Sequence, residues 1–115
     1  MDTEKRKMLG ESFLEASDGQ FLGKLCLNEF DSESVTNRFG QYGSQFSATS
    51  INNSFSVYGS PYSALSPNNP FTTTPPRIYL RGQFWGILTV NGFIYGPKIS
   101  PLELNKWMHI NGLYY

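Results

Sequence analysis

A repeat of 16 residues is the sequence feature that most limits how this chain can fold. Three copies follow one another without a gap: Phe30 to Gln45, Phe46 to Pro61 and Tyr62 to Arg77. Ser recurs at the fifth position, Asn at the eighth and Phe at the tenth, as in Ser50, Asn53 and Phe55 of the second copy. Self-similarity at a fixed short period indicates a repeat architecture, in which each unit packs against its neighbours.

Each copy is rich in residues that form turns. Ser, Asn, Gly and Pro are too frequent for a stable helix, and the apolar runs are too short for long strands. The side-chain oxygen at position two, carried by Asp31, Ser47 or Ser63, can cap a single helical or 3₁₀ turn. Asn tolerates a left-handed backbone and bonds to nearby backbone groups, so we expect the recurring Asn to hold one turn per copy.

Positions one, six, ten and thirteen of the first two copies are apolar or aromatic, and the third copy departs from this pattern at Thr74. In the first two copies they are Phe30, Val35, Phe39 and Tyr42, followed by Phe46, Ile51, Phe55 and Tyr58. One short unit cannot bury such a set alone, whereas stacked units can share it. We therefore expect these residues to form the core, with Phe39, Phe55 and Phe71 mostly buried. The alternative is an aromatic ladder on which a ligand stacks.

A second internal match brackets the repeats. The motif Gly-Gln-Phe-x-Gly begins at Gly19 and again at Gly82, and the residues after Phe93 are a degraded copy of those after Phe30. Alternating apolar residues predict strands at 20–27 and 83–90, entered through turns at Asp18-Gly19 and Arg81-Gly82. With leading strands at about 13–17 and 77–80, the pattern predicts two β-hairpins.

The ends of the chain differ in character. Ser100 and Glu103 form a capping box with Pro101 at the first helical position, which predicts a short helix over 101–108. We interpret residues 1–12 as an N-terminal tail. The predicted fold is mainly β with many turns, a small single domain over 13–115. It contains a hairpin at 13–28, three repeats at 30–77, a hairpin at 78–92 and the C-terminal helix.

Composition excludes several functional classes. Nine basic and nine acidic side chains cancel, so the excess positive charge that favours nucleic acid is missing. No stretch approaches the roughly 20 apolar residues of a membrane span, and the chain as given shows no signal peptide. The single Cys26 and single His109 would have to meet with an orienting group for nucleophilic catalysis. Asp31 and Glu33 lack the other ligands of a calcium loop. We predict no enzyme activity, metal or cofactor.

No charged residue occurs from Phe39 to Pro76, so this part presents neutral hydroxyl, amide and aromatic groups. We predict a non-catalytic structural or protein-interaction module, with Tyr42, Tyr58 and Tyr62 as binding residues. The alternatives are a carbohydrate or cell-surface binding module that uses these tyrosines as stacking platforms, a self-assembling structural protein, or a minimal hydrolase. The expected partner is another protein or a glycan, with no nucleic acid.

The pattern Tyr-Gly-Ser-x-[Phe/Tyr]-Ser-x-x-Ser-x-x-Asn begins at Tyr42 and again at Tyr58, and Asp18-Gly19-x-Phe21-Leu22-Gly23 precedes it. It resembles a set of uncharacterised bacterial, often cyanobacterial, short-repeat proteins, over about 18–107. The resemblance implies a repeat architecture and no particular activity. Many of the resembling proteins are exported with a signal sequence.

Overall fold

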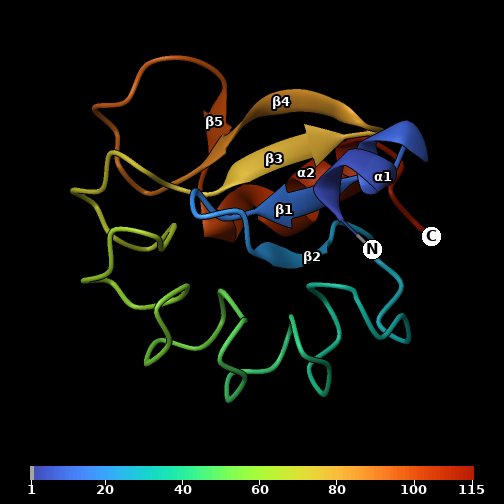
Figure 1. Cartoon of the computed structure of the whole chain (residues 1–115), viewed down its shortest axis with the longest axis horizontal. Helices are drawn as coiled ribbons and strands as arrows, with labels where there is room; N and C mark the ends of the chain where they lie inside the picture. Colours follow the sequence, from blue (N-terminus) through green and yellow to red (C-terminus); the bar gives the residue numbers. More distant parts are fainter. Residues whose placement is uncertain (1) are drawn as a thin grey trace.

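The computed structural model describes residues 2–115, and its centre is a five-stranded sheet (Figure 1). Its strands are β1 (Phe13–Glu15), β2 (Phe21–Lys24), β3 (Arg77–Leu80), β4 (Gln83–Leu88) and β5 (Lys98–Ile99). The order is β2-β1-β3-β4-β5, and all neighbours are antiparallel except β4 and β5. The first four strands lie within the ranges predicted from the sequence. β3 has its predicted length, and the other three strands are shorter than predicted.

The two halves of the sheet are related by an approximate two-fold axis between β1 and β3. At the centre Leu14 lies opposite Ile78. Leu14 is also paired with Gly23 of β2, and Ile78 with Gly86 of β4, and in both outer pairs the register shifts at the next residue. The repeated Gly-Gln-Phe-x-Gly motif therefore occupies the same place twice, because Gly23 and Gly86 are its last residues.

In each copy of the motif, the last glycine allows another segment of the chain to lie close against the strand. A β-carbon on Gly23, whose φ is +116°, would lie 2.8 Å from Val35 Cγ1. One on Gly86 would lie 2.3 Å from the carbonyl oxygen of Pro97. Both neighbouring segments run parallel to the strand. Ser34 forms a short parallel bridge with Lys24 at the end of β2, and β5 pairs with β4.

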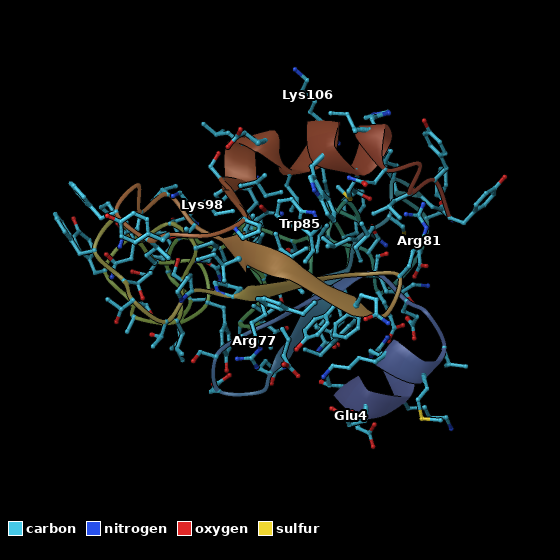
Figure 2. The ribbon with its side chains drawn as sticks, turned by 90° about the horizontal axis from the view of Figure 1, so that it is seen from above. Glu4, Arg77, Arg81, Trp85, Lys98 and Lys106 are labelled. Atoms are coloured by element: carbon cyan, nitrogen blue, oxygen red, sulfur yellow. The ribbon has the colours of Figure 1, made fainter. Side chains whose placement is uncertain are left out.

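Two helices cover opposite faces of the sheet (Figure 2). The helix α1 (Thr3–Met8) lies on one side, where Lys7 Nζ sits 4.8 Å above the ring of Tyr79. The 3₁₀ turn η1 (Pro101–Glu103) and helix α2 (Leu104–Ile110) lie on the other, where Trp107 meets Trp85 edge to face at 5.3 Å. The short C-terminal helix is confirmed and ends two residues later than predicted. Residues 3–8, by contrast, form a helix where the sequence suggested a tail.

The core lies between the sheet and α2. Its buried members come from the sheet, the helix and the turns between β2 and β3, and include Leu14, Leu22, Val35, Ile51, Ile78, Leu88, Leu104, Trp107 and Met108. On the other face, Phe13 stacks on Tyr79 with ring centres 4.7 Å apart, under α1. The structure is thus a small, mainly β domain with a mixed sheet.

Residues 28–76, here called the turn ribbon, run as an arc of successive turns from β2 round to β3 (Figure 1). Backbone N–H groups donate to carbonyl oxygens three residues earlier at Asp31, Ser34, Asn37 and Gly40, and again at Ser47, Ser50, Asn53 and Ser56. Longer steps, of four residues, end at Ser44 and Ser60. These bonds therefore recur with the period of the sequence repeat.

The side chain that begins a turn reinforces it by accepting the N–H two residues later, over 2.9–3.3 Å. The accepting residues are Asn28, Asp31, Ser34, Asn37, Ser44, Ser47, Ser50, Asn53, Ser60, Ser63, Ser66, Asn69 and Thr72. Side-chain oxygens of Ser, Asp and Asn are suited to this local bond. The polar composition of the repeats is therefore what builds the ribbon.

Only part of the expected core is buried. Val35 and Ile51 are 6% and 4% exposed, as predicted. The burial of Phe39, Phe55 and Phe71 was predicted wrongly, since their exposed fractions are 99%, 96% and 83%. Phe30 and Phe46, also expected in the core, are exposed as well. The physical reason is the three-residue step, because only the turns that begin at the buried Ser34, Ser50 and Ser66 point their next residue towards the core.

Candidate functional site

Six exposed rings of the turn ribbon are the most unusual surface feature of the molecule. We call them the aromatic row: Phe30, Phe39, Phe46, Phe55, Tyr62 and Phe71, each between 83% and 99% exposed. Phe30 and Phe39 line one surface groove and Phe46 and Phe55 line another, and exposed apolar side chains that gather in this way mark interaction sites in soluble proteins. Two of them belong to each 16-residue repeat.

The same local bond positions every ring of the row. Each is the third residue of a turn, and its backbone N–H donates to the Asn or Ser side chain that begins the turn. In the second repeat, Asn53 Oδ1 accepts from Phe55 N at 3.0 Å while Asn53 Nδ2 donates to Ser47 O at 2.9 Å. Asn37 and Asn69 bond in the same way, so the prediction that the recurring Asn side chains bond the backbone is confirmed.

Shallow grooves separate the rings of a repeat. A groove of about 590 Å³ lies between Phe30 and Phe39, and a second of about 590 Å³ lies between Phe46 and Phe55. The groove walls include Asn37 in the first case and the equivalent Asn53 in the second, with other polar groups beside them. Two repeats thus present the same alternation of exposed ring and groove, although Glu29 and Arg38 line the first groove and no charged residue lines the second.

The three tyrosines singled out in the sequence do not share one environment. Tyr42 is half-buried, and its ring meets Phe21 of β2 edge to face at 4.9 Å. Tyr58 is half-buried too, and its hydroxyl donates to Asp18 Oδ2 at 2.8 Å. Tyr62 is 91% exposed and belongs to the aromatic row. Tyr42 and Tyr58 therefore attach the ribbon to β2 and to the turn before it.

The environment of these two phenols also shows in their acidity. Burial raises the pKa of Tyr42. For Tyr58, burial first and then the bond to Asp18 raise the pKa. The exposed phenylalanines were not predicted as binding residues because they were assigned to the core, as Tyr42 and Tyr58 also were. An Asn or Ser two residues before each exposed ring distinguishes these rings from Tyr42, which follows Gly40. It does not distinguish them from Tyr58, because Ser56 stands two residues before Tyr58 but donates its hydroxyl to the carbonyl oxygens of Ser50 and Asn53.

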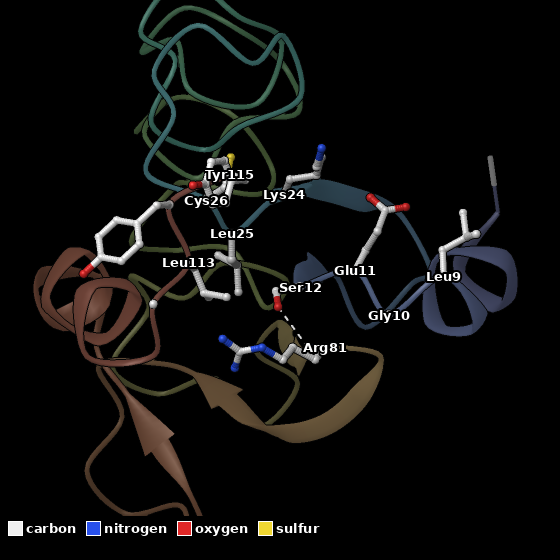
Figure 3. Close-up of a pocket in the computed structure, with 12 residues that line it drawn as sticks. Leu9, Gly10, Glu11, Ser12, Lys24, Leu25, Cys26, Arg81, Leu113 and Tyr115 are labelled. Atoms are coloured by element: carbon white, nitrogen blue, oxygen red, sulfur yellow. Dashed lines mark hydrogen bonds between the residues drawn. The ribbon is translucent and has the colours of Figure 1, made fainter.

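A second concave region lies between α1, the end of β2 and the C-terminal residues (Figure 3). Its volume is about 310 Å³, and its charged lining residues are Glu11, Lys24 and Arg81. Each is already engaged: Glu11 with Arg6 at 3.0 Å, Lys24 with Asp31 at 2.8 Å, and the Arg81 guanidinium with a carbonyl oxygen at the end of α2. These pairings hold the domain together.

Of the residues considered for catalysis or metal binding, Cys26 and Asp31 lie close together, with Cys26 Sγ 4.0 Å from Asp31 Oδ2, and His109 lies elsewhere. Cys26 lines this pocket but is buried, whereas His109 is exposed on α2 and does not line it. Asp31 pairs with Lys24, and Glu33 pairs with Arg6 at 2.9 Å. Within residues 2–115, no group of His, Cys, Asp and Glu is arranged to hold a metal ion.

The buried Arg6 was missed from the sequence, where it fell in the presumed tail. Its side chain is 4% exposed, binds Glu11 and Glu33, and lies 3.6 Å above the ring of Phe21. Burial alone would lower the pKa of Arg6, but the bond to Glu33 and the two nearby negative charges raise it overall. Arg6 thus joins α1, β2 and the turn ribbon, and its role is structural.

No protein-family model, curated protein or solved structure matches this chain. The resemblance to bacterial short-repeat proteins therefore stays a prediction. In the part of the chain that the structure describes, neither helix has the length and apolar character of a membrane span.

Proposed function

We propose that this protein is a non-catalytic interaction module whose contact surface is the aromatic row. In this proposal the three 16-residue repeats are the scaffold, and two β-hairpins, at 13–28 and 78–92, anchor the scaffold at its ends. The observation that carries the proposal is the exposure of every ring in the row, each on a turn closed by the same side-chain bond.

Two physical features support binding at this surface. First, the rings stand on turns that are already hydrogen-bonded, so binding would order little additional backbone. Second, the ribbon from Phe39 to Pro76 carries no charge, so contacts would come from apolar area and neutral hydrogen bonds. Such contacts are weakly affected by salt, because ionic screening acts on charges.

The identity of the rings favours a protein over a glycan as the partner. Five of the six are Phe, with Tyr62 as the exception, and Phe has no polar group with which to bind a sugar hydroxyl. A protein surface offers apolar area for such rings, and aromatic side chains are enriched at the centres of protein interfaces. Glycan binding by stacking on Tyr62 remains the second candidate.

A site-specific cross-linking experiment tests this proposal. The photoreactive residue p-benzoylphenylalanine replaces Phe55 in one variant and Lys106 in the control, because Lys106 points outward from α2 (Figure 2). Both variants are illuminated in an extract of the cells that make the protein. We expect a discrete cross-linked protein at position 55 and not at position 106, with a similar yield at low and high salt.

Two results would contradict the proposal. Equal products from positions 55 and 106 would mean that the row has no special affinity for proteins. Loss of the position-55 product at high salt would mean that charged residues outside the ribbon make the contact. Retention on an insoluble neutral polysaccharide, abolished by Tyr62→Ser, would favour the glycan alternative.

A further inference from the structure

We infer that the partner of the aromatic row is a second copy of this chain, docked row to row in a two-fold dimer. This inference rests on the proposed function, since it takes the row to be the contact surface. Area, charge and periodicity each favour a second copy as the occupant.

The exposed area is of the size that a stable dimer needs. Covering a Phe or Tyr side chain removes about 150–250 Å² from water. The six rings are nearly fully exposed, but the ribbon is an arc (Figure 1), so a second copy docked at its middle would cover the four central rings, Phe39, Phe46, Phe55 and Tyr62. Covering them would bury on the order of 800 Å² on each copy. A specific protein interface of standard size buries about 800 Å² per partner. The row alone therefore meets the requirement.

The charge of the surface is compatible with self-association. From Phe39 to Pro76 there is no charged side chain, so two copies can meet along this part without repulsion. The two charged residues that line the first groove, Glu29 and Arg38, have opposite signs. The surface therefore does not require a partner of positive or negative charge, and it can face an identical surface without electrostatic repulsion.

The spacing of rings and grooves is the most specific feature. Phe30 and Phe39 enclose one groove, and Phe46 and Phe55 enclose an equivalent groove one repeat later. A second copy has the same 16-residue period, so its rings can enter these grooves in successive repeats. A partner without this period could fill one groove but would lose register at the next.

A two-fold arrangement is the one in which two identical patches meet. Homodimers with two-fold symmetry use the same patch on both subunits and close without further growth. Reversing one row against the other places the middle repeats of the two copies together at the axis. Ser54 is exposed next to Phe55 in the middle repeat, so it should lie near the Ser54 of the second copy.

The test uses sedimentation equilibrium of the purified protein over a concentration series. We expect the chain to approach twice its own mass, and Phe46→Ser/Phe55→Ser to lose this association. Because both rings are exposed, the double variant should keep its circular dichroism spectrum. The control is Leu102→Ser/Ile110→Ser, which removes two exposed apolar side chains from η1 and α2 and should remain dimeric.

A cysteine variant tests the geometry of the dimer. Under mild oxidation Ser54→Cys should form a disulfide-linked dimer, while Ser17→Cys, exposed in the turn before β2, should not. The native Cys26 is buried and leaves the background low. A monomer at every concentration, equal dissociation in the Leu102/Ile110 control, or no linkage at position 54 would overturn the inference.

The outcomes separate this inference from the proposed function. If the chain is monomeric and the cross-linker at position 55 captures a different protein, self-association fails and the interaction surface stands. If position 55 captures no protein and the monomer binds neutral phosphatidylcholine vesicles through the row, both fail and the row is a membrane contact. Capture of a second copy at position 55 supports both.

Discussion

Replacing Gly23 by alanine should destabilise the fold for two reasons that the structure separates. Gly23 has a φ of +116°, which side-chain-bearing residues rarely adopt, and a β-carbon there would lie 2.8 Å from Val35 Cγ1 and 2.8 Å from Tyr42 Cβ. Backbone strain of this kind costs about 1–2 kcal/mol, and overpacking costs about 1–3 kcal/mol. We therefore expect Gly23→Ala to lower the free energy of unfolding by about 2–5 kcal/mol.

Three other glycines supply matched controls. Gly19 has a φ of +92° with open space around it, Gly86 has the close contact without the positive φ, and Gly92 has neither. Alanine at Gly92 should change stability by less than about 0.5 kcal/mol. Alanine at Gly19 should cost only the strain, and alanine at Gly86 only the overpacking.

Urea unfolding followed by circular dichroism measures all four variants. The slope of the transition should stay constant, so that differences in midpoint report stability. If Gly23→Ala and Gly92→Ala had the same midpoint, the ribbon would not lie close against β2 at Gly23. The equivalence between the neighbouring segments at Gly23 and Gly86 would then fail as well.

Two further predictions concern the ribbon. Phe55→Ala should change the free energy of unfolding by less than about 0.5 kcal/mol because the ring is exposed. Ile51→Ala should lower it by about 2–5 kcal/mol because Ile51 is buried. Equal midpoints in urea would show that Phe55 does not face solvent while Ile51 faces the core. The bond from Lys24, and then the backbone N–H of Glu33, lowers the pKa of Asp31. The ion pair therefore stabilises the fold by about 1 kcal/mol at pH values above the unfolded pKa of about 3.9. This stabilisation is lost as pH falls through the lower pKa of the folded state. Asp31→Asn should therefore be less stable than the parent at pH 7 and match it near pH 2, and a deficit that persisted in acid would contradict the ion pair.

The sequence was sufficient for the elements whose causes are local. The capping box at Ser100 and Glu103 predicts the start of the C-terminal helix, and Glu103 Oε1 accepts from Ser100 N at 3.0 Å. The recurring Asn side chains are also explained locally, since one amide both accepts and donates within its own turns. Such features depend on bonds between residues close in the chain, and the chain spells them out.

The direction of the aromatic side chains could not be predicted in the same way. Phe55 and Ile51 are both large and apolar, and nothing in their identity says which one faces the core. The answer depends on the three-residue step of the ribbon and on which turn meets α2, and both are properties of the assembled domain. The buried Arg6 was missed for a similar reason, because its partner Glu33 lies far along the chain.

The step length of the turn ribbon also limits how its gene can change. A single inserted or deleted residue would leave each later turn closed, because the closing bond joins residues only two apart, but it would break the step at that point and shift every later inward residue relative to α2. Loss of three residues would keep the three-residue step but would remove one turn and displace the inward residues Val35 or Ile51 from α2. Only the gain or loss of a whole 16-residue unit keeps both the step and the spacing of the inward residues. We therefore expect the ribbon to lengthen or shorten by unequal recombination between its own copies.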